Sequence, residues 1–382
     1  MTPSSANPLR ILACWGSPTL KSYFASSFLK NPRYKIEVVS GDRSKEKSPD
    51  AASWARLWSL RRRLERGEFD LVLSSPIHNS PWPRPKRLAT CLAQAFRYFT
   101  YKHRMLDSYW ASWLLSGKLR GKIPLTAIDY LDTSYVLPRE LPLLRASTLY
   151  FKSNLSYWPE RALNPLESIF GMDLTKEDKA KIRPLTYGFS RSSIPDTARP
   201  MRERDIDICF TGTIIPARSE GDISPFPELT SNPIRRDIYE RCLKLKEKYN
   251  VYCVDRVVPF AEYKELLQRS KLMVSTESFG CETSRHYSAS SAGAIPLINW
   301  TYAQNYRQLE PDIHAIYFSL IGDDFERVVD QALASPEKLD RISQATRAYT
   351  IAEKEQQHIA DHVIDETLRQ HAAQSSSLAN VA

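Results

Sequence analysis

The sequence lacks two features that would place it in a membrane or outside the cell. None of its 382 residues lies in an apolar stretch near the roughly 20 residues that a membrane-spanning helix needs. The N-terminal segment MTPSSANPLRILACWGS also lacks the layout of a signal peptide. We therefore expect a cytosolic protein, and its length favours two domains over one.

Paired cysteines are also absent. The six cysteines are scattered, with no C-x-x-C pair among them, which argues against a zinc site and against a disulfide framework. We interpret all six as buried thiols: Cys14, Cys91, Cys209, Cys242, Cys253 and Cys281.

Short apolar runs alternate with helix-like segments in the first half of the chain. Helices are expected at 19–29, 51–66 and 86–117. The apolar runs are LRILACW (9–15), YKIEVVS (34–40), FDLVLSS (69–75), LTAIDYL (125–131) and ASTLYFKS (146–153). This repetition predicts a parallel sheet covered by helices, in a first domain spanning 1–190.

A polar segment with prolines and clustered charges, 191–205, is predicted to link this domain to a second one over 206–349. There the alternation restarts, with strands at 205–212, 250–255, 271–277 and 294–299 and helices near 233–248, 260–269 and 283–292. The predicted fold class is α/β, with two doubly wound Rossmann-like domains and a ligand in the cleft between them, at the carboxyl ends of the strands.

The C-terminal segment repeats apolar residues at helical spacing. A helix is predicted over 350–371, because Ile351, Ile359, Val363 and Leu368 fall roughly on one face. The polar tail 372–382 is expected to be disordered.

The stretch FGCETSRHYSASSAGAIPLIN (279–299) holds the residues that point most directly to chemistry. Gly280 permits a tight turn after a buried strand, and the residue types that begin a helix follow: Glu282, Thr283 and Ser284. A helix start at the carboxyl end of a strand is a phosphate site, to which Arg285 in the first turn adds a charged fork. The alternative is a helix that packs tightly on the sheet through its small residues, with Arg285 in solvent.

The stretch KLMVSTESFGCETSRHYSASSAGAIPLIN resembles the donor-site segment of GT-B glycosyltransferases, especially the CgeB-like and exostosin-like families, and its order is similar to that of α1,3-fucosyltransferases. Two further stretches resemble other parts of these enzymes: DICFTGTI (207–214), the strand and glycine loop that open the second domain, and 128–155. The pattern T-x-R-x-Y/F-E-A, three residues and G-x-x-P is matched at Thr283, Arg285, Tyr287, Ala289, Gly293 and Pro296.

The resemblance implies transfer of a sugar from a nucleotide-sugar donor to a glycan acceptor of a cell-surface polysaccharide, with the acceptor on the first domain. One position departs from it, because Ser288 stands where these families have the glutamate that accepts the ribose hydroxyls. That contact then falls to Glu282, the favoured candidate, or to Glu277. A catalytically degenerate binding protein and a sugar-nucleotide epimerase remain alternatives.

Glycosyl transfer needs groups that hold the departing diphosphate. Gly212 and Thr213 could offer backbone N–H groups, with Arg218 or Arg235 assisting, although each arginine could equally be a surface charge. Asp205 and Asp207 spell D-x-D, the metal motif of the other glycosyltransferase fold. This pair begins a strand instead of ending one, so we expect no metal and no cofactor.

An inverting enzyme also needs a base on the first domain to activate the acceptor hydroxyl. The candidates follow predicted strands: His78, Asp129 and Asp132. Each has a structural alternative, a backbone-bonded loop histidine or carboxylates that cap the next segment. A retaining enzyme would need no such base.

The net charge of +9 indicates anionic partners, and the segment 82–122 concentrates it by interleaving Arg and Lys with aromatic residues. Trp110, Trp113, Leu114 and Leu115 add apolar surface. With RRRLER (61–66), this composition suits the anionic inner face of a membrane and a lipid-linked acceptor. A core helix with basic flanks is an equal alternative, and nucleic acid is a weaker one because no recognised binding motif accompanies the patch.

Overall fold

The computed structural model of the chain describes residues 7–15, 31–40, 54–75, 114–119, 121–130, 136, 140–156, 174–190, 195–212, 214, 232–277 and 281–379. The chain forms two compact units. Unit 1 comprises Met1–Leu185 and Ile359–Ala382, and unit 2 comprises Thr186–His358.

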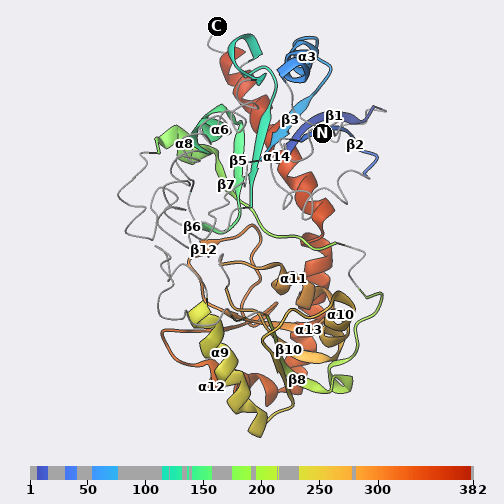
Figure 1. Ribbon diagram of the computed structural model, residues 1–382, viewed down its shortest axis with the longest axis vertical. Coiled ribbons are helices and arrows are strands. Elements are labelled where there is room, and N and C mark those ends of the chain that lie inside the picture. The colour runs from blue at the N-terminus through green and yellow to red at the C-terminus, as the bar shows by residue number, and fades with distance from the viewer. Residues whose placement is uncertain are drawn as a thin grey trace, which may run out of the picture. The chain divides into compact units, whose positions relative to one another are not determined.

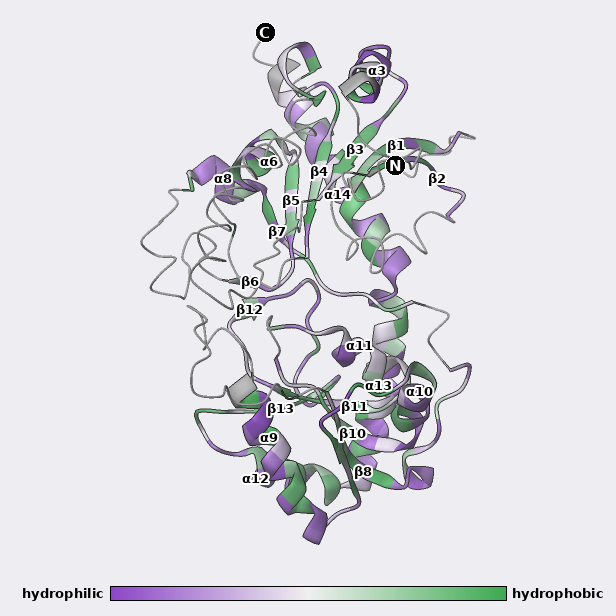
Figure 2. Cartoon of the chain, in the orientation of Figure 1, coloured by the Kyte–Doolittle hydropathy of each residue, from purple (hydrophilic) through white to green (hydrophobic). Residues whose placement is uncertain are grey.

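Unit 1 is built on a parallel sheet with the strand order β2-β1-β3-β4-β5-β7 (Figure 1). The strands are β1 (Leu9–Trp15), β2 (Tyr34–Ser40), β3 (Leu71–Ser74), β4 (Leu125–Asp129), β5 (Leu149–Lys152) and β7 (Ile182–Pro184). Strands β3, β4 and β5 are buried along their whole length, as expected for near-continuous apolar runs in a parallel sheet. Figure 2 shows them largely in green.

Four helices and two short elements complete the described part of unit 1. They are α3 (Trp54–Glu65), η3 (Gly117–Leu119), α6 (Leu141–Ala146), β6 (Leu155–Ser156), α8 (Lys176–Lys181) and α14 (Gln356–Ala379), which begins in unit 2 and belongs to unit 1 from Ile359. Arg33 pairs with Asp361 and Asp365 of α14, and Thr126 in β4 donates to Thr367 at 2.8 Å. The C-terminal helix is therefore part of the first unit's core.

Unit 2 is built on a second parallel sheet, with the order β13-β11-β10-β8-β9. The strands of this sheet are β8 (Ile206–Thr211), β9 (Val251–Val254), β10 (Ser270–Val274), β11 (Ile295–Asn299) and β13 (Ile316–Phe318). The short strand β12 (Ala303–Gln304) lies outside it. Its helices are η6 (Met201–Glu203), α9 (Asn232–Lys244), η7 (Leu245–Glu247), α10 (Phe260–Arg269), α11 (Ser284–Ser291), α12 (Phe325–Leu333) and α13 (Pro336–Glu353).

Helices cover both faces of the second sheet. Alternate residues of a strand point to opposite faces. Phe210 in β8 joins a core cluster with α9 and α12, whereas its neighbour Cys209 joins another with α10 and α11. The predicted fold class, α/β with two doubly wound units, is confirmed.

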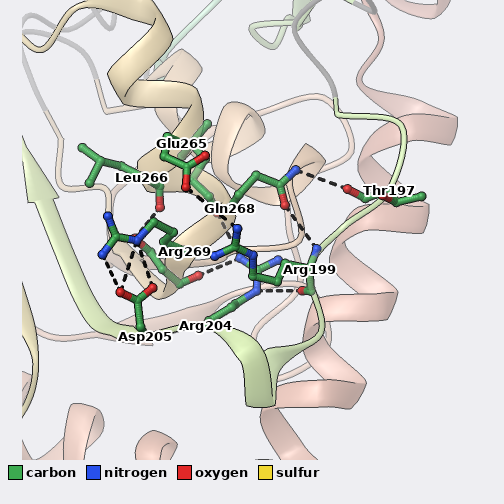
Figure 3. A network of polar contacts seen from close by, with 10 residues as sticks. Thr197, Arg199, Arg204, Asp205, Glu265, Leu266, Gln268 and Arg269 are labelled. Carbon is green, nitrogen blue, oxygen red and sulfur yellow. Dashed lines mark hydrogen bonds and ion pairs between the residues drawn. The ribbon is translucent and has the colours of Figure 1, made fainter.

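The segment expected as a linker is packed into unit 2 over residues 195–205. Arg204 is buried, and its guanidinium donates to the carbonyl oxygens of Leu267, Ser270 and Ala292 at 2.7–2.9 Å. Figure 3 shows this corner, where Gln268 also contacts Thr197 and Arg199. Burial lowers the pKa of Arg204 to about 10. The composition of the segment indicated solvent exposure and could not show that its arginine caps the helices beside it.

The C-terminal boundaries also differ from the prediction. The region 350–371 is divided between the end of α13 and most of α14, and residues 372–379, expected to be disordered, continue α14. The hydroxyls of Ser375 and Ser376 each donate to a carbonyl oxygen one turn earlier, at 3.0 Å. These serines satisfy their hydroxyls within the helix, so the polar composition did not exclude a helix here.

The cysteine interpretation is confirmed for the five cysteines among the described residues. Cys14, Cys209, Cys242, Cys253 and Cys281 are free and buried, and Cys91 lies outside the described residues. Burial raises the pKa of the Cys14 and Cys281 thiols. Within the described ranges, no helix is long and apolar enough to cross a membrane, and no group of His, Cys, Asp and Glu could hold a metal ion.

Candidate functional site

The strand order places a crevice at one position along the carboxyl edge of the second sheet. From β8 the chain moves outward to β9, and from β10 it moves the opposite way to β11, so the connections diverge between these two adjacent strands. Ligands of doubly wound folds bind outside the carboxyl ends of the strands at such a point. Gly212 follows β8 here, and Ser275 and Glu277 follow β10.

Two arginine side chains, those of Arg235 and Arg285, converge on Gly212, and these three residues form the arginine corner. A Cβ atom built on this glycine would lie 3.1 Å from Nη2 of Arg235 and 3.3 Å from Nη2 of Arg285. Gly212 has φ of +151°, in the region that L side chains rarely adopt. Glycine here therefore lets the backbone pass close to both guanidinium groups, one from α9 and one from the first turn of α11.

The two guanidinium groups carry the same charge and are partly desolvated. Burial lowers the pKa of Arg285, whose Nη1 atom is buried with no hydrogen-bond partner among the described residues. Burial, followed by the charge of Arg285, lowers the pKa of Arg235 to about 10. Like charges side by side disfavour each other's charged forms, and an anion beside Arg285 would favour its charged form.

The start of α11 adds uncapped backbone donors to the same corner. Thr283 is the N-cap residue with extended backbone, yet its side chain makes no capping hydrogen bond and instead lies 3.3 Å from Oγ of Ser275. The side chain of Thr283 thus caps none of the first N–H groups of the helix, and the N–H of His286 donates instead to the Thr283 carbonyl oxygen at 3.1 Å. His286 shares Ser275 through Nδ1 at 2.7 Å, and burial lowers its pKa to about 3, so it stays neutral.

The other end of α11 is fixed in the core. Arg347 donates to the carbonyl oxygen of Ser291, and Ser343 donates to that of Gly293 at 2.6 Å. Hydroxyls on the predicted small face bond back within the helix, Ser288 to Ser284 at 3.1 Å and Ser291 to Ser288 at 2.9 Å. The alternative interpretation of this stretch, a helix that packs tightly through its small residues, therefore holds for the second half of α11. The first turn instead places Arg285 beside Gly212.

Glu282, the favoured ribose ligand, lies in a closed network. It is 2% exposed and accepts hydrogen bonds from Thr186 at 2.7 Å, from the backbone N–H of Tyr187 at 3.1 Å, and from Tyr287. Burial raises its pKa, and the nearby charge of Lys354 opposes that shift. Because both carboxylate oxygens already serve internal donors, this position does not support a role in ligand contact.

Glu277, the second ribose candidate, is better placed. It lies just beyond β10 and is half-buried, and its backbone N–H donates to Oδ1 of Asn299 at 2.9 Å. Burial raises its pKa, and a side-chain hydrogen bond with Asn299 opposes that shift. Of the predicted site residues, Gly212 thus lies beside Arg285, and Thr283 lies beside Ser275, which follows β10 as Glu277 does. Ser284 and Ser288 belong to α11, while Thr213 and Gly280 lie outside the described residues.

In unit 1, Asp129 is the one base candidate that the described residues include. Its Oδ2 atom accepts from Lys152 at 3.0 Å and from Tyr150 at 2.8 Å, and the Asp129 and Lys152 side chains are both 0% exposed. A base must reach the acceptor hydroxyl, so this position does not support the catalytic prediction for Asp129. His78 and Asp132 lie outside the described residues.

Three further sequence features also have a place in the structure. Asp205 and Asp207 form ion pairs with Arg269 and Lys271 at the start of β8 and β10, away from the carboxyl edge. Leu114 and Leu115 are buried, which favours the core-packing alternative for the end of the segment 82–122. Arg218, Trp110 and Trp113 lie outside the described residues.

A cavity of about 400 Å³ lies in unit 1. Its lining includes Thr148 and Lys181, which precede β5 and β7, so it lies at the amino ends of these strands. Arg145 and Lys181 belong to the last turns of α6 and α8, where cations offset the negative end of the helix dipole. These charges therefore have a structural explanation, and the arginine corner remains the candidate site.

Comparisons with known proteins gave matches among solved structures only. No family model matches the chain, and no curated protein matches it. The chain is similar to a glycosyltransferase from Rickettsia africae, with 10% identity over 95% of this chain and 99% of that one and a TM-score of 0.54. It is also similar to the catalytic domain of starch synthase IV from Arabidopsis thaliana, bound to ADP and acarbose, with 9% identity over 96% and 100% of the chains and a TM-score of 0.52.

At these identities the likeness shows the fold. The chain has two Rossmann-like units, as GT-B glycosyltransferases do. The resemblance to CgeB-like, exostosin-like and fucosyltransferase families stays a prediction, because no family model matches.

Proposed function

We propose that this protein is a glycosyltransferase that transfers a sugar from a nucleoside diphosphate-sugar to a glycan acceptor. The observation that carries the proposal is the convergence of Arg235 and Arg285 on Gly212, beside the uncapped start of α11. Two half-buried cations and the first backbone N–H groups of α11 match the charge and the hydrogen-bonding needs of a diphosphate. The fold shared with starch synthase IV, which is bound to ADP, supports the same choice of ligand.

The arrangement suits the chemistry of glycosyl transfer. As the bond from the sugar to the diphosphate breaks, negative charge grows on the departing phosphate oxygens. Arg285 and Arg235 are already oriented and partly desolvated, so their attraction to that charge increases in the transition state. In this proposal the guanidinium groups supply the charge stabilisation for which a divalent metal would otherwise be needed.

The ribose hydroxyl groups of the donor need a carboxylate as well. Glu277 is the available one, because Glu282 is occupied by internal hydrogen bonds and Ser288 carries only a hydroxyl, which donates to Ser284. Glu277 also has a suitable place, since it follows β10, where the connections from β8 and β10 diverge. We therefore assign the ribose hydroxyl groups to Glu277.

The acceptor is proposed from the family resemblance and the basic aromatic segment 82–122. A lipid-linked precursor of a cell-surface polysaccharide, met at the inner face of the membrane, fits both. The same resemblance leaves two alternatives, a binding protein without catalysis and an epimerase. A transferase releases nucleoside diphosphate only when acceptor is present, whereas an epimerase interconverts the donor alone and a binding protein turns over neither.

The donor site is tested by calorimetric titration with UDP, ADP, GDP, CDP and dTDP, with and without EDTA. We expect one nucleotide to bind, insensitive to EDTA, and Arg285→Ala to weaken it by about 10- to 100-fold, since a charge-assisted hydrogen bond contributes roughly 1.5–3 kcal/mol. Arg269→Ala is the matched control, because Arg269 pairs with Asp205 on the surface. Binding of no nucleotide by the wild type, or equal affinity in a folded Arg285→Ala variant, would sink the proposal.

A further inference from the structure

An exposed aromatic pair lies at the carboxyl edge that carries the arginine corner. Trp300 directly follows β11, and its ring centroid lies 4.5 Å from that of Tyr317 in β13, with the planes inclined by 31°. Trp300 is nevertheless 53% exposed. Its free apolar face is a large surface left in water, and aromatic faces of this kind bind flat apolar groups.

The pair is held rigidly before any ligand arrives. The hydroxyl of Tyr317 donates to the carbonyl oxygen of Leu309 at 2.8 Å, which orients the ring behind Trp300. The backbone N–H of Trp300 donates to the carbonyl oxygen of Phe318 at 3.0 Å, and Asn299 Nδ2 donates to the carbonyl oxygen of Trp300 at 3.3 Å. A surface fixed in this way loses little conformational entropy on binding.

Polar groups border the exposed indole. Asn299 donates through Nδ2 to the backbone carbonyl oxygen of Trp300 and accepts through Oδ1 from the backbone N–H of Glu277, so it ties the ends of the neighbouring strands β11 and β10 together. Tyr302, two residues beyond Trp300, is 43% exposed. An exposed aromatic face matches a pyranose ring, which has an apolar face of C–H groups and a rim of hydroxyls.

The distance between Trp300 and the arginine corner suits a sugar attached to a diphosphate. β8 and β11 are separated by β10 alone, so their ends are roughly 10 Å apart at a spacing of about 4.8 Å per strand. A ring attached to a diphosphate at Gly212 can cover such a span.

We propose that Trp300, backed by Tyr317, stacks on the pyranose ring of the transferred sugar. The inference rests on the proposed function and deepens it, because it assigns the sugar part of the donor to a surface separate from the diphosphate. It makes the donor class a nucleoside diphosphate-hexose.

The test compares each nucleotide with its sugar form in calorimetric titrations of wild type and Trp300→Ala. The pairs are UDP with UDP-glucose, ADP with ADP-glucose, and GDP with GDP-mannose. We expect Trp300→Ala to bind the free nucleotide as the wild type does and to lose about 10-fold in affinity for the sugar form, because the apolar surface buried between the indole and the sugar ring is lost. Trp300→Phe should recover part of the loss.

The matched control is Trp58→Ala in α3 of unit 1, because Trp58 is also 53% exposed. It should change neither affinity. Equal weakening of the nucleotide and its sugar form by Trp300→Ala would mean that the indole stacks on the base, and unchanged affinity for both would mean that it touches neither; each result overturns the inference while the proposed function stands. If the wild type binds no nucleotide at all, the proposed function and this inference fail together.

Discussion

The carboxyl ends of the two sheets hold charges in opposite arrangements. In unit 1, Asp129 at the end of β4 is paired with Lys152 at the end of β5, and both side chains are fully buried. In unit 2, Arg285 and Arg235 lie side by side at Gly212, two half-buried charges of the same sign. A buried pair of opposite charges stabilises the charged form of both partners, whereas neighbouring like charges disfavour each other and attract a ligand of the other sign.

The largest expected loss of stability comes from removing one partner of the Asp129–Lys152 pair. Lys152→Met removes the cation that pairs with the buried carboxylate of Asp129. Removing one partner of a buried pair costs about 3–5 kcal/mol, which denaturant unfolding would show as a lower midpoint. The double variant Asp129→Asn with Lys152→Met should recover much of this loss. A cost below about 1 kcal/mol for Lys152→Met would contradict the structural role assigned to the pair.

In unit 2, we expect the free energy of unfolding to depend on pH through His286. His286, next to Arg285, has a folded pKa of about 3 against an ordinary value near 6.5, because burial and the arginine charge oppose its protonation. The unfolded chain therefore binds the extra proton between these values, and stability falls as the pH drops below about 6.5. Linkage gives a loss of about 2 kcal/mol between pH 7 and pH 5 from this group alone.

The measurement is denaturant unfolding at several pH values for the wild type and His286→Gln. The variant keeps a polar side chain near Ser275 and cannot be protonated, so its stability should change less over this interval. His358→Gln is the control, since His358 is exposed. Parallel pH profiles of wild type and His286→Gln would show that His286 does not titrate as its burial requires.

A smaller effect of opposite sign is expected at the arginine corner. Arg285→Met keeps most of the side chain's length and removes one of the two adjacent charges, so the ligand-free protein should become more stable by about 1 kcal/mol. Saturating nucleotide should reverse the order, because ligand bound to the native state stabilises only a protein that retains the site. Thermal unfolding with and without the nucleotide provides the measurement. A loss of ligand-free stability in Arg285→Met would mean that Arg285 serves packing instead of binding.

The sequence predicted strands β1 to β5 and β8 to β11 because buried parallel strands are near-continuous apolar runs, such as VLS in β3 and MV in β10. It did not predict β7 and β13, which are three residues long each. It also placed the start of α11, where Glu282 and Thr283 precede the helix. These features depend on neighbours along the chain, so local residue types were sufficient.

The partners of individual charges could not be predicted in the same way. Glu282 looked open to a ligand, but its donors come from Thr186 and Tyr187, 95 or more positions away in the chain. Arg235 looked like one more surface arginine until the fold brought α9 to Gly212. Trp300 had no signal beyond its position at a strand end, because exposure is decided by tertiary packing. Which charges remain for a ligand is thus a property of the folded chain.

The smallest effect is expected from a third arrangement, the exposed pair of Asp205 with Arg269 at the opposite edge of the second sheet (Figure 3). Arg269 lowers the pKa of Asp205 to about 2, so the pair stabilises the fold above the ordinary pKa near 3.8 and loses this contribution as the pH falls through 2. Water and salt reach both side chains, which are 38% and 49% exposed, so Arg269→Ala should cost less than about 1 kcal/mol. The cost should shrink further in 0.5 M salt, and nucleotide affinity should not change. A larger, salt-resistant cost would place this pair with Asp129 and Lys152, and burial would then no longer be what separates a structural charge from an incidental one.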